Sequence, residues 1–365
     1  MNKLRTANPL CAGLRQCWPL VVLMAAIDYS LLLAEEPLVK PKDGAEKNAE
    51  PLPLFNMPGE VHKGPLPKLT EHELVLAKSL KSDVEMLANE IGERNVSNFH
   101  YDDLLAAERF LRKSLMDAGY KVERQPYVVQ GREVANLIAE IPGGDKKDEF
   151  VVIGGHYDSV VGCPGANDNG TGTAATLALA RKFAKTKPTR TLRFVFFVNE
   201  EPPWFQTKEM GSVVYAKRCK ERKDNIVAML SLETIGYYSD EKGSQKFDSL
   251  PPLRLLYPDT GNFIAFVADV KSGPLVQQVV GKFRETTKFP AYGCAMPDNI
   301  PGVGWSDQWS FWQMGYSAVM VTDTAPFRYP HYHKKTDTPD KIDFERTARV
   351  VAGLEQVIAD LAGVK

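Results

Sequence analysis

The sequence has few cysteines, no excess of charge and no long uninterrupted apolar run. Only five of its 365 residues are cysteine, and Cys11 and Cys17 fall in an N-terminal segment expected to be removed. Cys163, Cys219 and Cys294 remain, and no CxxC pair exists. This pattern argues against a zinc–thiolate site and allows at most one disulfide, so we expect buried or free thiols.

The charges of the chain nearly cancel. The 45 basic and 46 acidic residues leave a formal net charge of -1, so the charge balance favours neither nucleic acid nor an anionic membrane as a partner. Apolar residues make up 44% of the chain and aromatic residues 10%. Such a composition is typical of a packed globular protein rather than a disordered one.

The first residues differ from the rest. Lys3 and Arg5 precede an apolar stretch over residues 17–27, and a basic segment followed by a short apolar one is typical of an export signal. Asp28 interrupts the stretch, so we expect no stable membrane span. We predict a signal peptide over residues 1–34 and an exported protein, periplasmic or extracellular. A disordered start is the alternative.

A tether and a single domain are expected after the leader. Residues 35–68 are rich in Pro, Lys and Glu without apolar periodicity, which predicts a tether. Residues 69–365 then form one domain. Its first helix begins after Thr70, which forms a capping box with Glu73.

Apolar runs alternate with helical segments along this domain. Strands are predicted over 150–155, 192–199 and 226–232, with helices over 172–184 and 211–222 between them. This order predicts an α/β fold with a mixed, mostly parallel twisted sheet and helices on both faces. The remaining predicted elements are helices over 101–118, 273–287 and 344–361 and strands over 120–129, 133–141, 263–267 and 318–321.

Two long segments lack a predicted element, 237–262 and 289–309. Loops of this length within a compact domain are usually functional, so we expect them to wall a substrate pocket. Six aromatic residues are candidates for an apolar lining: Trp204, Phe205, Tyr292, Trp305, Trp309 and Phe327.

Acidic and histidine side chains follow the ends of three predicted strands. His156 and Asp158 follow the first, Glu200 and Glu201 the second, and Glu233 ends the third. The carboxyl ends of neighbouring strands form the site of an open α/β sheet. Buried carboxylates need compensating cations, and imidazoles with carboxylates suit a two-zinc hydrolase.

The motifs around these residues resemble the M28 family of zinc exopeptidases. The first are Gly154-Gly-His-Tyr-Asp-Ser159, Gly165-Ala-Asn-Asp-Asn-Gly-Thr-Gly172 and Asn199-Glu-Glu201. The resemblance covers about 300 residues, from Thr70 to the C-terminus, and implies a zinc-dependent exopeptidase fold. It continues in order through Met210-Gly-Ser212, Leu232-Glu-Thr-Ile-Gly236, Ser306-Asp307 and Tyr332-His-Lys-Lys-Thr-Asp-Thr338.

The resemblance also implies a ligand set. His156 and Glu233 would hold one metal ion, Glu201 and His333 the other, and Asp168 would bridge the two. Nitrogen and carboxylate ligands of this kind suit zinc, so we expect two zinc ions, with one as the alternative. The family further implies a cis peptide bond between Asp168 and the residue after it.

Glu200 is the predicted general base, which would take a proton from metal-activated water and pass it to the departing amine. Pro202 and Pro203 end the preceding strand, so that Glu200 and Glu201 need not point to opposite faces. Tyr332 matches a family position whose phenol can stabilise an oxyanion, and an aromatic wall is the alternative.

Two aspartates are expected to orient the imidazoles. Asp158 lies two residues from His156 and is expected to accept its second N–H. Asp337 is expected to serve His333 in the same way. The spacing of the motif favours His333 over His331 as the ligand.

Two positions depart from the family pattern. Glu233 stands where the family commonly has aspartate, which leaves the occupancy of that metal site open. Gln308 stands where histidine commonly follows Ser-Asp, and a glutamine cannot titrate.

The leading hypothesis is an aminopeptidase that acts on a peptide or aminoacyl substrate. A single-zinc acyltransferase resembling glutaminyl cyclase and a non-catalytic binding relative are the alternatives. Carboxypeptidase activity would need an arginine for the substrate carboxylate, and Arg328 is the candidate near the site.

Overall fold

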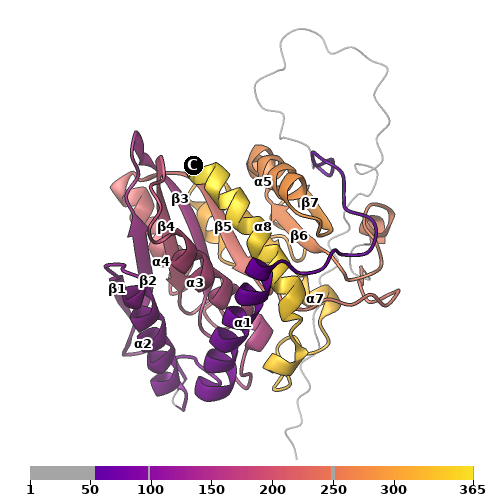
Figure 1. Cartoon of the computed structure of the whole chain (residues 1–365). Helices are drawn as coiled ribbons and strands as arrows, with labels where there is room; N and C mark the ends of the chain where they lie inside the picture. The colour runs from indigo at the N-terminus through magenta and orange to yellow at the C-terminus, as the bar shows by residue number, and fades with distance from the viewer. Residues whose placement is uncertain (1–53, 98, 248–250, 365) are drawn as a thin grey trace, which may run out of the picture. The chain divides into compact units, whose positions relative to one another are not determined.

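A computed structural model describes residues 54–97, 99–247 and 251–364 (Figure 1). The expected signal peptide, residues 1–34, and most of the expected tether lie outside the described residues. Among the described helices, none combines the length and the apolar character that crossing a bilayer requires.

One eight-stranded sheet organises the described chain, in the order β1-β2-β4-β3-β5-β8-β6-β7. The pairs β4–β3, β3–β5, β5–β8 and β6–β7 are parallel, and the other three are antiparallel. The sheet is therefore mixed and mostly parallel, as predicted. The strands are β1 (Glu123–Val129), β2 (Arg132–Ile141), β3 (Lys146–His156), β4 (Arg190–Phe197), β5 (Asn225–Glu233), β6 (Ile264–Ala268), β7 (Ala291–Ala295) and β8 (Ala318–Thr322).

Helices cover both faces of this sheet. Val151 and Ile153 of β3 pack in the core shared with α1, α2, α3, α5 and α8, whereas Val152 between them packs with α4 and α6. Because successive side chains of a strand point to opposite faces, a continuous apolar run fills both cores. The helices are α1 (Glu71–Glu85), α2 (Tyr101–Asp117), α3 (Gly172–Phe183), α4 (Gly211–Arg222), α5 (Gly273–Thr286), α6 (Gln308–Gln313), α7 (Ala325–Arg328) and α8 (Phe344–Ala362).

The segment ahead of α1 packs on the domain. Leu54 forms a backbone bridge with Ala295 of β7, and Met57 is buried. The side chain of Arg284 donates to the carbonyl oxygens of Met57 and Gly59 at 3.0 and 2.8 Å. The predicted tether therefore contacts the domain from Leu54 onward, ahead of the expected boundary at residue 69. Thr70 and Glu73 do form the predicted capping box of α1.

The segment 289–309 is predicted from sequence to be a loop, but it contains strand β7, and helix α6 begins at its end. β7 consists of small residues with Tyr292 and contains Gly293, a composition that carries little strand propensity. α6 has only six residues, too few to show the regular spacing of apolar residues that predicts a helix. Tertiary packing against β6 and β8 places both.

Candidate active site

The central parallel strands bring the predicted residues to one edge of the sheet. β3 ends at His156, β5 ends at Glu233, and β4 lies on the other side of β3 and ends shortly before Glu200 and Glu201. Asp168 lies in the turn that leads into α3, and its bond to the next residue is cis, as predicted.

Asp168 joins two groups of ligand-type atoms. On one side, His156 Nε2 lies 3.5 Å from Asp168 Oδ1 and 3.3 Å from Glu233 Oε2. On the other, His333 Nε2 lies 3.1 Å from Asp168 Oδ2 and 3.2 Å from Glu201 Oε2. Asp168 thus offers one oxygen to each group.

These separations of 3.1–3.5 Å are close to those between ligand atoms of a metal centre. Zinc bonds of about 2.0–2.2 Å in tetrahedral geometry hold neighbouring ligand atoms about 3.3–3.6 Å apart. Neither ring nitrogen of His156 nor Oε1 of Glu201 has a hydrogen-bonding partner of good geometry among the described residues. Such buried polar atoms need a partner, and a divalent cation would provide it. His156, Glu200 and Glu201 form a further group of suitable atoms.

The crowded carboxylates perturb one another. Burial, with repulsion from Glu201, raises the pKa of Glu200 well above its usual range. Burial and the neighbouring Asp168 raise the pKa of Glu201 to about 7. Burial alone would lower the pKa of His333. Its contacts with Asp168 and Glu201 outweigh this effect and raise the pKa to about 10. Because metal ligands must be deprotonated, a bound cation would displace these protons.

Asp158 lies beside His156, but their contact lacks the geometry of the expected hydrogen bond. Its Oδ1 is 3.4 Å from Nδ1 of His156, close enough to orient the ring after a small adjustment. The same carboxylate accepts from the backbone N–H groups of Glu200 and Glu201 at 3.2 and 3.3 Å. One side chain therefore positions residues that follow two strands.

Asp337 does not serve His333 as predicted. It accepts from the backbone N–H groups of Asn167 and Asp168 at 2.8 and 3.0 Å and from the hydroxyl of Tyr329 at 2.7 Å. Its oxygens are thus committed to the turn that carries the shared carboxylate. Asp337 therefore positions Asp168, a role that the spacing to His333 did not reveal.

His333 lies within the cluster of ligand-type atoms, and its neighbours differ in their positions relative to it. The ring of Tyr332 stacks on His333 with centroids 4.0 Å apart. His331 is turned away, with Nδ1 2.9 Å from the hydroxyl of Thr336. Tyr332 therefore lies beside the cluster and His331 outside it.

Glu233 is held by Ser306, which belongs to a motif of the family resemblance but was given no role in the sequence analysis. The hydroxyl of Ser306 donates to Glu233 Oε2 at 2.7 Å, and Asn169 Nδ2 lies 3.4 Å from the same oxygen. Gln308, at the second departure from the family pattern, donates to the carbonyl of Val303 at 3.0 Å. The longer glutamate is thus still directed toward His156, and Gln308 fixes a loop.

Ser306→Ala should weaken zinc binding at the His156–Glu233 site about 10- to 100-fold, because the hydroxyl orients the ligand carboxylate. Competition with a chromophoric chelator measures this affinity. Ser310→Ala is the matched control, since Ser310 is also buried and bonds to Ser212 at 2.8 Å. Equal zinc affinities in the two variants would contradict the role of Ser306.

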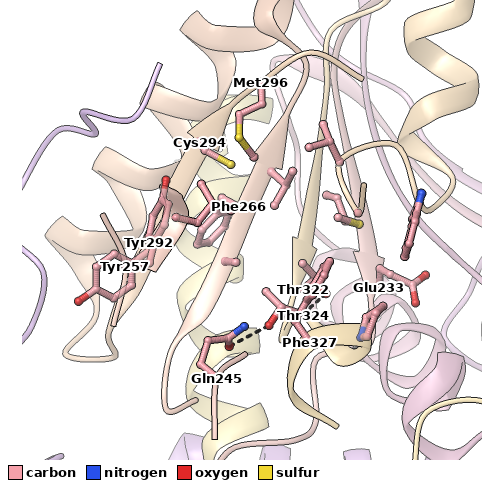
Figure 2. A pocket seen from close by; sticks show the side chains of 18 of the residues that line it. Glu233, Gln245, Tyr257, Phe266, Tyr292, Cys294, Met296, Thr322, Thr324 and Phe327 are labelled. Atoms are coloured by element: carbon pink, nitrogen blue, oxygen red, sulfur yellow. Dashed lines mark hydrogen bonds between the residues drawn. The ribbon is translucent and has the colours of Figure 1, made fainter. Parts of the chain in front are cut away.

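A nearly apolar cavity of about 90 Å³ lies beside Glu233 and Tyr332, both of which line it (Figure 2). The two long segments contribute to its wall, as predicted. Of the six aromatic candidates, Tyr292, Trp305 and Phe327 line it, whereas Trp204, Phe205 and Trp309 do not. The sequence analysis did not include the lining aromatics Phe247, Tyr257, Phe263 and Phe266.

Arg328 is not placed to bind a substrate carboxylate. It is buried, and its guanidinium donates to Gln245 Oε1 at 2.9 Å and to the carbonyl of Phe263 at 2.8 Å. It also packs over the ring of Phe263 and does not line the cavity. Arg328 therefore contacts Phe263, a residue that lines the cavity, without lining the cavity itself.

The cysteines of the domain are Cys163, Cys219 and Cys294, and all three are buried free thiols. The expectation of unpaired cysteines is confirmed.

Comparison with known proteins places the chain in a family. The model of peptidase family M28 matches residues 136–358, and the chain belongs to that family. The uncharacterized protein YfbL of Escherichia coli K12 is 32% identical over 285 residues, which cover 76% of this chain and 86% of YfbL. A protein of Leptosphaeria maculans described as a probable zinc metalloprotease is 24% identical over 255 residues. That match covers 62% of this chain and only 56% of the relative.

Solved structures share the fold. An aminopeptidase from Aneurinibacillus sp. strain AM-1 superposes with a TM-score of 0.59 at 17% identity, covering 80% of this chain and 96% of the other. A glutaminyl cyclase from Fimbriiglobus ruber gives a TM-score of 0.55 at 19% identity, covering 82% and 97%. The family match identifies the protein as a metallopeptidase of the M28 family.

Proposed function

We propose that the protein is an aminopeptidase that uses two zinc ions. The observation that supports this most directly is the pair of ligand groups that meet at Asp168, beside a cavity that Glu233 borders. His156, Asp168 and Glu233 would hold one ion, and Asp168, Glu201 and His333 the other. When bound, zinc supplies a Lewis acid that polarises the scissile carbonyl and lowers the pKa of water.

The chain itself supplies the proton transfer. Glu200 Oε2 lies 3.6 Å from His156 Nε2, at the edge of the metal centre. A buried carboxyl with a raised pKa can take a proton from attacking water and give it to the departing amine. The phenol of Tyr332, beside His333, can donate a hydrogen bond to the developing oxyanion.

The cavity indicates which N-terminal residues are preferred. Its wall is built from aromatic and aliphatic side chains, and its volume far exceeds the space that one buried water needs. A large apolar side chain would therefore occupy it, while the free amine stays near the carboxylates of the metal centre.

Phenylalanyl p-nitroanilide should be cleaved with a kcat/KM about 10- to 100-fold above that of the alanyl compound, because burying the phenyl group gains about 1.5–3 kcal/mol. The N-acetylated phenylalanyl compound is the control and should not be cleaved, since it has no free amine. Equal cleavage of the acetylated compound, or a preference for alanine, would contradict the proposal.

Glutaminyl cyclase activity is the second candidate, because a cyclase shares the fold over most of both chains. Two measurements separate the candidates: the zinc content of the pure protein, and pyroglutamate formation from a peptide with N-terminal glutamine. One zinc per chain with cyclisation would favour the cyclase.

A further inference from the structure

Arg94 is a completely buried arginine next to the metal centre. It follows a π-helical turn, Met86–Ile91, and has no exposed surface. Its guanidinium contacts backbone carbonyl groups rather than a carboxylate: Nε donates to Tyr157 at 2.7 Å, and Nη2 donates to Gly165 at 2.9 Å. Burying a cation without an ion-pair partner costs folding free energy. We therefore expect Arg94 to have a function that offsets this cost.

The carbonyl groups that Arg94 holds belong to the two segments that present the shared metal site. Tyr157 directly follows His156, and Gly165 precedes the turn that carries Asp168. Gly165 has a φ of +64°, and a Cβ there would lie 2.5 Å from the carbonyl oxygen of Asp168. The guanidinium thus ties the end of β3 to a tightly packed turn.

A second pair of contacts strengthens this connection. The backbone N–H of Arg94 donates to the hydroxyl of Ser159 at 3.1 Å, and the N–H of Ser159 donates to the carbonyl of Arg94 at 2.9 Å. Arg94 Nη1 also donates to Pro164 at 2.5 Å. The side chain and the backbone of Arg94 together therefore fix several residues of the loop 157–165.

The positive charge of Arg94 interacts with the carboxylates of the acidic cluster. Burial lowers its pKa to about 10, while Asp158, Asp337, Asp168 and Glu201 oppose that shift. The group therefore remains cationic at neutral pH. Its positive charge offsets part of the repulsion within the acidic cluster.

We propose that Arg94 is a positioning residue for the metal centre, which holds His156 and Asp168 at ligand distance and compensates part of the negative charge around them. This inference rests on the metal centre of the proposed function but not on aminopeptidase activity. Removing the guanidinium should let the loop 157–165 and the turn at Asp168 move apart.

Arg94→Met should weaken zinc binding about 10- to 100-fold, as outer contacts to ligands commonly do. Arg94→Lys keeps N–H donors for the carbonyl groups but loses the planar fork, so it should bind zinc more tightly than the Met variant and about tenfold more weakly than wild type. The readouts are zinc affinity by chelator competition and the rise in Tm that saturating zinc produces, which reports binding to the folded state.

Arg193→Met is the matched control. Arg193 is also buried, pairs with Glu140 and Asp224 at 2.7 and 2.6 Å, and lies near the start of β4. Its substitution should lower the Tm without zinc and leave zinc affinity unchanged, as expected for a purely structural arginine.

Zinc affinity equal to wild type in Arg94→Lys overturns the proposal, and this variant decides the question if Arg94→Met does not fold. Equal losses of zinc affinity in the Arg94 and Arg193 variants overturn it as well. A wild-type protein that binds no zinc overturns both proposals, whereas zinc binding without peptidase activity overturns only the proposed function.

Discussion

Glu200→Gln should lower kcat at least about 100-fold while the protein keeps its zinc. The amide retains the size of the side chain and its hydrogen-bonding capacity, but it cannot accept the proton of the attacking water, and general base catalysis contributes about 10²–10⁴-fold. The measurements are steady-state kinetics on a phenylalanyl substrate and zinc content by mass spectrometry. Glu209→Gln is the control, since Glu209 lies in the same loop region and its side chain pairs with the exposed Lys208.

The same variant separates two roles of Glu200. This side chain also belongs to a group with His156 and Glu201 whose atoms could hold an ion. A loss of zinc in Glu200→Gln would identify Glu200 as a ligand, and unchanged kcat would exclude it as the base.

Asp168→Asn should weaken zinc binding at both sites, because each oxygen of Asp168 faces a different histidine and asparagine keeps only one, uncharged oxygen. An amide nitrogen cannot replace the second carboxylate oxygen as a ligand. Zinc affinity should fall at least about 100-fold, which is more than the loss expected for a residue that only contacts a metal ligand. Activity should fall to background. Zinc titration at fixed protein concentration measures the number of sites and their affinities.

Single-site variants provide the comparison for Asp168→Asn. Glu233→Gln changes a group that faces only His156, and Glu201→Gln changes the carboxylate beside His333. Each should lose one zinc ion and retain the other. If Asp168→Asn binds both ions as tightly as wild type, the shared carboxylate is not a bridge.

The strand ends were predictable from sequence because three apolar runs stop directly before acidic or histidine residues. The order β4-β3-β5 then places His156, Glu201 and Glu233 at one edge. Asp168 and His333 lie in loops, and only the resemblance to a family indicated them. Loop residues have no hydrophobic period from which a position in space can be derived.

The supporting contacts were harder to predict. Asp337 binds the turn at Asp168 instead of His333, and Arg94 binds carbonyl groups 63 and 71 residues further along the chain. Backbone carbonyls have the same chemistry in every residue, so the sequence does not mark which of them an arginine will contact. The pocket wall was predicted only in part, because Phe263 and Phe266 lie in a predicted strand and not in the long segments expected to form the wall.

The attachment of the chain at Leu54 has a practical consequence for recombinant work. Met57 packs against Gly293, a residue of the pocket wall, and Arg284 clamps the neighbouring carbonyl groups. A shortened gene that starts at residue 69 would expose the free edge of β7 and remove this backing from the specificity pocket. Truncations intended for crystallisation or assay should therefore begin upstream of Leu54.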